Sequence, residues 1–295
     1  MERGYDMKKM MSTLLLSTLV LGSLNTAVFA EEGITTNETS EGKVHFVVDD
    51  EATNPPVSPP IVDPTDPENP DPTTPEITPD EPDKETGQTG PLTIDFVSTL
   101  NFGIQKISNS DETYPAFASK STITGSDVKV INPNYVQITD NTGSLAGWTL
   151  KVEQTQAFKD EAEHELEGAK INVSNGAVNS ASDTTGIEAK EAFAIEPSTE
   201  EKAISVEVMT ASEGHGAGQF FYLAGNGGTA VTEELGETRG TLVKADVLGE
   251  DGQVSGQDWF NTAVQLEVPG ASVKKSTAYT AELTWTLTNQ PANEA

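Results

Sequence analysis

The sequence predicts an all-β protein with one folded domain in its C-terminal two thirds. Three observations lead to this prediction. Short runs of alternating apolar and polar residues follow one another after residue 91, turn-forming residues separate these runs, and the first 90 residues offer little material for a core. Alternation with a period of two is typical of half-buried strands. The predicted domain spans residues 91–295 and is a single β-sandwich or barrel-like structure, since such domains reach about 200 residues.

The N-terminal residues 1–30 are predicted to be a signal peptide. Lys8 and Lys9 form a basic start, Leu14–Leu24 forms an apolar segment, and a cleavage site ends at Ala30. An uncleaved membrane helix is the alternative, but polar residues interrupt the apolar run, which is shorter than the ~20 residues that a span needs. The sequence therefore predicts secretion, with no membrane insertion after cleavage.

Residues 31–90 are predicted to be an acidic, proline-rich, disordered linker. They carry 16 acidic and two basic side chains, and 11 of the chain's 17 prolines lie between Pro55 and Pro82. Proline cannot donate to a β ladder and favours an extended predecessor, so we expect a spacer of roughly 3.1 Å per residue. A peptide for proline-binding modules is the alternative. One apolar patch, Lys43–Val48, precedes the prolines and is a candidate contact for a partner.

Within the domain, alternating runs predict the strands in order. The runs are Ile94–Leu100, Tyr135–Thr139, Gly147–Val152, Ile204–Met209, Val264–Val268 and Tyr279–Leu287. The last run is the most regular, because every second residue is apolar and the residues between them are polar. One stretch, Ala157–Lys170, has helical propensity and is expected to form a short helix or an acidic loop.

Composition excludes several classes of function. The chain has no cysteine, which excludes disulfides, thiolate zinc sites and a lipoprotein anchor. Its formal charge of −30, from 17 basic and 47 acidic side chains, opposes binding to nucleic acid. The same charge weighs against binding to anionic membranes and anionic wall polymers, although screening beyond ~8 Å still permits short-range contacts. The C-terminal residues 289–295 contain no sorting signal or apolar tail, so we expect surface retention to be noncovalent.

The sequence nominates no catalytic or metal site. His45, His164 and His215 are far apart and lack metal-ligand spacing. Glu250–Asp258 is rich in oxygen donors without the spacing of an EF-hand, so a weak calcium site is the open alternative there. No nucleophile elbow is present, and the glycine-rich Gly214–Gly218 is expected to be a flexible turn. We therefore predict a nonenzymatic protein without cofactor or metal.

Two Trp-x-Leu tripeptides, Trp148–Leu150 and Trp285–Leu287, use two of the chain's three tryptophans. Residues two apart in a strand share a face, so each Trp points the same way as its Leu. Two interpretations are open: the four residues form a core seam between strands from opposite ends of the domain, or each Trp is a platform for sugar rings. Burying one Trp and one Leu together contributes on the order of 5 kcal/mol.

These tripeptides and their flanks resemble the WxL-domain surface proteins of Gram-positive bacteria. The resemblance covers residues 91–295 and is carried by Leu100–Gly103, Val136–Val152, Leu266–Gly270 and Tyr279–Pro291. It implies noncovalent attachment to the peptidoglycan of the cell wall at the cell surface, alongside companion surface proteins. The resemblance carries the wall-binding role over to Trp148, Leu150, Trp285 and Leu287. The alternative function is an adhesin or assembly subunit that binds other surface proteins, with indirect retention at the wall.

Overall fold

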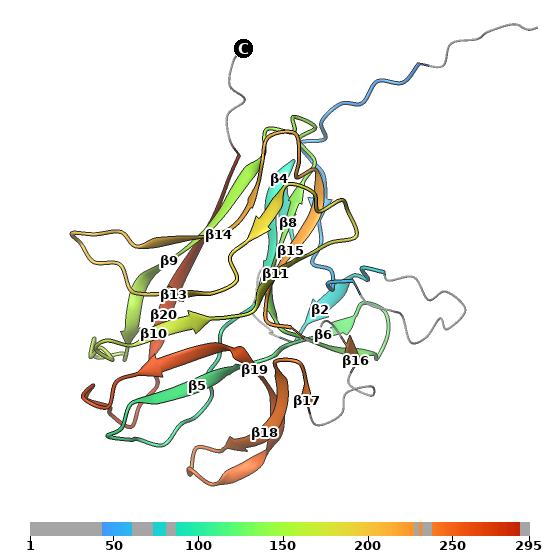
Figure 1. Ribbon diagram of the computed structural model, residues 1–295. Helices are drawn as coiled ribbons and strands as arrows, with labels where there is room; N and C mark the ends of the chain where they lie inside the picture. Colours follow the sequence, from blue (N-terminus) through green and yellow to red (C-terminus); the bar gives the residue numbers. More distant parts are fainter. Residues whose placement is uncertain (1–42, 61–72, 81–86, 227–229, 232–237, 290–295) are drawn as a thin grey trace, which may run out of the picture. The chain divides into compact units, whose positions relative to one another are not determined.

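The computed structural model describes residues 43–60, 73–80, 87–226, 230–231 and 238–289 (Figure 1). The predicted signal peptide and its cleavage at Ala30 lie outside these residues. The chain divides into two units, Met1–His45 and Phe46–Ala295. In the first unit, Lys43–His45 are described and form no strand. All strands belong to the second unit, and the described residues include no helix, which confirms the all-β class.

Two four-stranded sheets line most of the main core. The first, the β8 sheet, has the order β11 (Gly176–Asn179), β15 (Gly218–Ala224), β8 (Asn134–Asp140) and β4 (Leu92–Val97). The second, the β9 sheet, has the order β12 (Ile187–Ala189), β14 (Ser205–Ala211), β9 (Trp148–Lys159) and β20 (Thr280–Asn289). All strand pairs in both sheets are antiparallel.

Two further sheets and a short ribbon complete the second unit. The β19 sheet contains β13 (Phe193–Ile195), β10 (Lys170–Val173), β19 (Val254–Val268), β18 (Leu242–Leu248) and β17 (Thr238–Arg239), and β5 (Glu112–Phe117) also pairs with β19. The β7 sheet contains β16 (Ala230–Val231), β7 (Lys129–Asn132), β6 (Ser119–Ile123) and β2 (Ile77–Pro79). The ribbon pairs β1 (Thr53–Asn54) with β3 (Gln88–Thr89). The described part of the chain contains no helix with the length and apolarity that a membrane crossing requires.

The main core lies where the β8, β9 and β19 sheets meet. In β9, the side chains of Trp148, Leu150 and Val152 are fully buried, and the residues between them are more exposed, as the alternation predicts. The Trp148 ring packs against Phe220 of β15 with ring centroids 5.7 Å apart, so the β9 sheet contacts the β8 sheet. The β19 sheet adds apolar side chains from β10, β13 and β19 to the same core.

The six predicted strands are confirmed, since each alternating run overlaps one of β4, β8, β9, β14, β19 and β20. Of the two alternatives for Ala157–Lys170, the structure shows a loop after the end of β9. The Asp160 carboxylate accepts hydrogen bonds from the backbone N–H groups of Ala162, at 2.9 Å, and His164, at 2.8 Å. Such local side-chain bonds satisfy backbone donors without a helix, which explains why helical propensity does not prevail here.

Part of the segment that the sequence assigns to the linker contributes to the folded unit. Val57 and Ile77 are buried in a small apolar cluster, and β1, β2 and β3 all precede residue 91. Gln137 of β8 holds this segment: its Oε1 accepts the Val57 N–H at 2.7 Å, and its Nε2 donates to the Pro55 carbonyl at 3.0 Å. A proline-rich backbone lacks donors, so a long amide side chain from the sheet supplies the missing partners.

Candidate functional site

The two Trp-x-Leu tripeptides lie on neighbouring strands. β20 pairs antiparallel with β9, in a register that sets Leu287 opposite Leu150 and Trp285 opposite Val152. Figure 1 shows β20, in dark red at the end of the described chain, beside the green β9. The structure therefore brings the four predicted site residues together in one sheet, although they come from opposite ends of the domain sequence.

The first tripeptide is part of the core. Neither Trp148 nor Leu150 has exposed surface. The Trp148 indole Nε1 donates a hydrogen bond to the Gly216 carbonyl oxygen at 2.9 Å, which satisfies the polar atom of a buried ring. The Trp148 ring is enclosed on all sides, so none of its surface is open to a ligand in this structure.

Two glycines allow the backbone to approach Trp148 closely. Gly216 has a φ of +92°, and a Cβ at this position would lie 2.6 Å from the Trp148 Nε1. Gly147 has a φ of +77°, and a Cβ there would collide with the carbonyl oxygen of Ala211. Both positions require glycine for conformation and for space. The sequence alone does not reveal this role, because a glycine-rich stretch such as Gly214–Gly218 is equally typical of a flexible turn.

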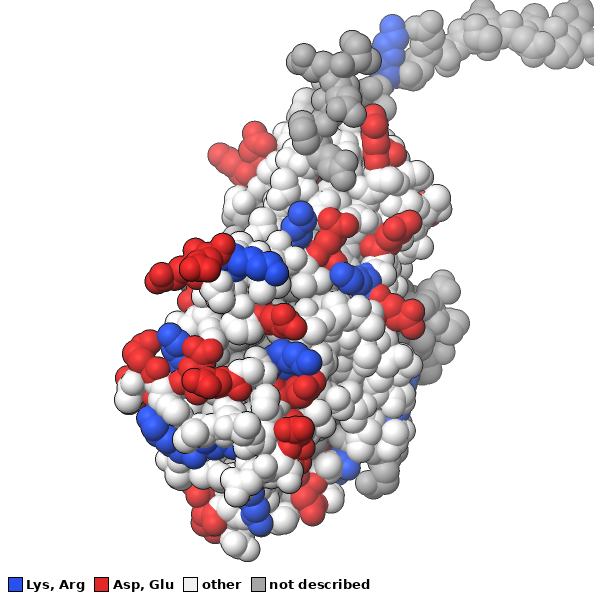
Figure 2. All heavy atoms as spheres, turned by 60° about the vertical axis from the view of Figure 1, so that its left-hand side comes forward, with Lys and Arg blue, Asp and Glu red and all other residues white. Residues whose placement is uncertain are grey.

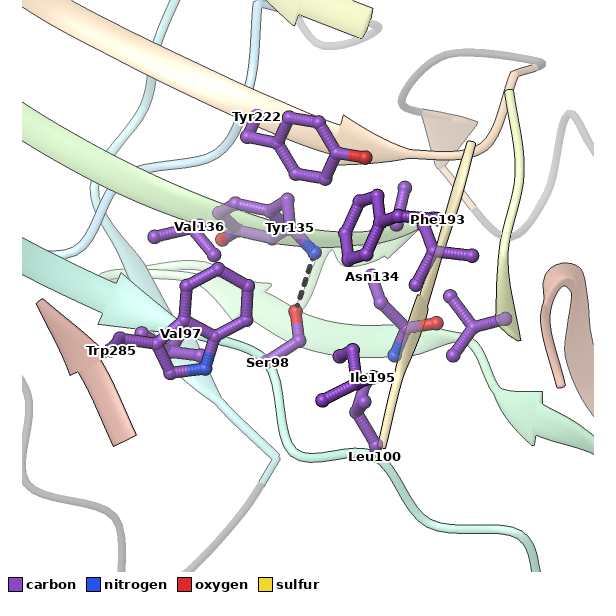
Figure 3. Close-up of a pocket in the computed structure, with 13 residues that line it drawn as sticks. Val97, Ser98, Leu100, Asn134, Tyr135, Val136, Phe193, Ile195, Tyr222 and Trp285 are labelled. Atoms are coloured by element: carbon purple, nitrogen blue, oxygen red, sulfur yellow. Dashed lines mark hydrogen bonds between the residues drawn. The ribbon is translucent and has the colours of Figure 1, made fainter. Parts of the chain in front are cut away.

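The second tripeptide is less enclosed. Trp285 and Leu287 are only partly buried, and Trp285 forms one wall of a small apolar pocket (Figure 3). The accessible volume of this pocket is about 20 Å³, which suits one methyl group or one water molecule. Its few polar groups serve the fold; the Ser98 hydroxyl, for example, accepts the Tyr135 backbone N–H at 2.9 Å. Of the two motif tryptophans, Trp285 is the one that a ligand can reach.

A buried carboxylate lies on β4, at the other face of the β8 sheet from the tripeptides. Asp95 accepts hydrogen bonds from the hydroxyl groups of Thr93, at 2.5 Å, and Thr139, at 2.6 Å, and from the Gln137 Nε2 at 2.9 Å. Burial raises the pKa of Asp95 above its ordinary value of 3.8, and the three hydrogen bonds partly oppose this rise. Three neighbouring side chains donate to this carboxylate, and one of them, Gln137, also donates to the Pro55 carbonyl next to β1, so Asp95 has a structural role beside this segment.

The other candidates from the sequence do not converge on a metal site. In the described ranges, no group of three or more His, Cys, Asp or Glu side chains is placed to hold a metal ion. The oxygen-rich Glu250–Asp258 covers the turn between β18 and β19, where the Asp251 carboxylate accepts the Gln253 backbone N–H at 3.0 Å. The His164 Nε2 lies 2.8 Å from the Val273 carbonyl oxygen, which pins the loop after β9.

The surface is predominantly acidic. Figure 2 shows Asp and Glu side chains spread over one face, with Lys and Arg among them. Individual ion pairs join strands, as between Lys120 and Asp258 at 2.6 Å and between Lys170 and Glu267 at 3.3 Å. Partly exposed pairs of this kind contribute about 0–1 kcal/mol each. This face offers no continuous basic stripe of the kind that nucleic-acid binding requires.

An all-β unit whose two Trp-x-Leu strands pair in one sheet fits the class that the sequence resemblance indicated, a surface-binding domain. A family model described as "WxL domain surface cell wall-binding" matches residues 33–291, and the chain belongs to this family. Comparisons with the curated proteins and with the solved structures gave no match. The protein is therefore a surface protein that binds the cell wall noncovalently, and the predicted resemblance and location are confirmed. The family is defined by binding rather than by catalysis. The residues that match the family model include β1, β2 and β3.

Proposed function

We propose that the WxL domain attaches the exported protein to the peptidoglycan of the wall and performs no reaction on it. The observation that carries this proposal is the family match over residues 33–291. In this proposal residues 1–30 are a signal peptide. Its wall-binding domain comprises residues 91–295 together with β1, β2 and β3. In this proposal the domain works as a β-sandwich, with the β8 and β9 sheets as its layers.

A binding role without catalysis is supported by the chemistry of the described residues. Glycan hydrolysis uses two carboxylates on either side of a bond, about 5–9.5 Å apart, and one of them has a raised pKa. Asp95 has a raised pKa, but it is buried among three protein donors and has no second carboxylate among its hydrogen-bond partners. The small pocket beside Trp285 is lined almost wholly by apolar groups.

The tripeptides then support attachment in two different ways. Trp148 and Leu150 hold the β9 sheet on the core, so their replacement weakens binding only by unfolding the domain. Trp285 and Leu287 lie on the outer strand and are only partly buried. If a wall component contacts any motif residue directly, it contacts Trp285.

Sedimentation with protein-stripped cell walls tests the proposal. The full chain is expected to sediment with purified peptidoglycan at physiological salt, without releasing soluble fragments from labelled material. A chain that stays in the supernatant, but sediments once companion surface proteins are added, supports the adhesin or assembly alternative instead. Released fragments would contradict the absence of catalysis.

A pair of variants separates the two roles of the motif. Trp285→Ala is expected to remain folded, and Trp148→Ala is expected to lose folded structure, as judged by near-UV circular dichroism. A folded Trp285→Ala chain that no longer sediments identifies Trp285 as a wall contact. A folded chain that sediments as wild type shows that the second tripeptide serves the fold alone.

A further inference from the structure

The pocket beside Trp285 lies where three sheets meet. Val136 lines it from the β8 sheet, Trp285 from the β9 sheet and Phe193 from the β19 sheet. In Figure 3 the Trp285 and Phe193 rings lie on different sides of the pocket. Side chains on strands are positioned more precisely than side chains on loops, so the shape of this pocket is set by the fold.

The pocket is partly open to solvent and has an apolar rim. Four of its lining residues are partly exposed, and all four are apolar: Val97, Leu100, Phe193 and Trp285. Val136 is buried and belongs to the floor. A group that enters from solvent therefore passes between two aromatic rings and two aliphatic side chains.

The pocket suits a methyl group rather than a water molecule. Its accessible volume of about 20 Å³ has room for one group of either kind, but a buried water needs two to four polar partners. The polar side chains of the lining are engaged elsewhere. The Asn134 Nδ2 donates to the Phe117 carbonyl oxygen at 3.1 Å. The Tyr222 hydroxyl donates to the Lys190 carbonyl oxygen at 3.0 Å, and the Ser98 hydroxyl is occupied as described above.

Charge decides which methyl group of the wall the pocket can receive. Peptidoglycan carries methyl groups on the acetamido groups of its uncharged sugars and on the alanines of its stem peptides, which also carry free carboxylates. Residues 91–295 contain 29 acidic and 12 basic side chains, so they repel carboxylates at short range and do not repel an uncharged sugar. The partly exposed Trp285 ring also offers an apolar surface to the C–H groups of a sugar ring.

We propose that this pocket binds the acetamido methyl group of an N-acetylated sugar in the glycan strand, with the Trp285 ring against the sugar ring. The N–H and C=O groups of the acetamide stay at the rim, where water hydrates them, so no polar group is buried without a partner. This inference rests on the proposed function and names the wall component that the domain recognises.

Two uncharged oligosaccharides test the proposal on the full chain. Chitotetraose and cellotetraose have the same β-1,4-linked backbone, but each acetamido group of the first is a hydroxyl group in the second. Calorimetric titration measures both affinities, and tryptophan emission reports on Trp285 because Trp148 and Trp259 are buried. Chitotetraose is expected to bind at least about tenfold more tightly, since one methyl group in an apolar pocket changes affinity by about 10–200-fold. Equal affinities, or no binding of either, would overturn the proposal.

A matched pair of variants locates the binding site. Val97→Ile adds one carbon at the rim of the pocket, in space that the acetamido methyl group would occupy. Val206→Ile makes the same change at a partly buried valine of β14 that does not line the pocket. Val97→Ile is expected to lower the preference for chitotetraose about tenfold while keeping the wild-type urea midpoint, and Val206→Ile is expected to keep the preference. Equal preferences in the two variants would refute the pocket as the site.

Sedimentation with purified peptidoglycan keeps this inference separate from the proposed function. A chain that sediments with peptidoglycan but does not distinguish the two oligosaccharides retains the wall-binding function and overturns the acetamido site. A chain that prefers chitotetraose but stays in the supernatant supports the acetamido site and contradicts direct wall binding.

Discussion

Leu150 and Leu287 form a matched pair for testing the asymmetry of the two tripeptides. They face each other across β9 and β20, but Leu150 is fully buried and Leu287 is only partly so. Replacing Leu150 with alanine removes buried carbon and leaves a closed cavity, so we expect a loss of about 2–5 kcal/mol in the free energy of unfolding. Replacing Leu287 removes side-chain carbon already in contact with water and leaves no closed cavity, so we expect a loss of about 1 kcal/mol.

Urea denaturation followed by tryptophan fluorescence and far-UV circular dichroism measures both losses. With a denaturant slope of about 3 kcal/mol per molar urea for a domain of this size, Leu150→Ala should lower the midpoint by roughly 1 M and Leu287→Ala by roughly 0.3 M. Thr286→Ala, at an exposed position on the same strand, is the control and should change stability by less than about 0.5 kcal/mol. Equal midpoints for the two leucine variants would refute the assignment of one tripeptide to the core and the other to the edge.

Three further predictions follow from the same structure. Gly216→Ala should lower the free energy of unfolding by about 2–4 kcal/mol in urea denaturation, because its Cβ would lie 2.6 Å from the Trp148 Nε1. The control Gly214→Ala has no atom within 4 Å of its Cβ and should lose only about 1 kcal/mol through backbone strain. Burial raises the pKa of Asp95, so its favourable contribution to the free energy of unfolding is complete below pH 3.8 and is lost as the pH rises. The stability of the wild type relative to Asp95→Asn should therefore increase as the pH falls from 7 to 4 in thermal melts. A constant difference would contradict this. Backbone hydrogen bonds lower the pKa of Asp160 below 3.8. In thermal melts at matched salt, the greater stability of the wild type over Asp160→Asn should be complete above pH 3.8 and should shrink as the pH falls below it.

The strands could be predicted because their signal is local. Alternation in β9 and β20 reports a half-buried surface, whatever lies opposite it. The same alternation in two strands does not show how deeply the apolar face of each is buried, because the depth depends on the position of the strand within its sheet. Trp148 is in an inner strand and Trp285 in an outer strand, and the sequence around the two residues gives no indication of this difference.

Features that depend on distant partners could not be predicted. Gly216 meets Trp148 across a gap of 68 residues, and Gln137 meets Val57 across a gap of 80. The proline-rich composition between Pro55 and Pro82 predicts a spacer because proline lacks a backbone donor. It does not reveal that Gln137 of β8 bonds to the Val57 N–H and the Pro55 carbonyl, or that Val57 and Ile77 are buried in one apolar cluster.

The position of β20 explains why the chain repeats one tripeptide. A Trp and a Leu two residues apart give a strand one broad apolar face, which can pack on a core from any position in a sheet. In β9 this face is closed by Phe220 and by the strands on both sides, so the tryptophan fixes the fold. In β20 the same face has a paired strand on one side only, so part of the Trp285 ring remains exposed. One local sequence is therefore fully buried at the centre of the sheet and only partly buried at its edge, and the difference between Leu150→Ala and Leu287→Ala measures how much stability each position contributes.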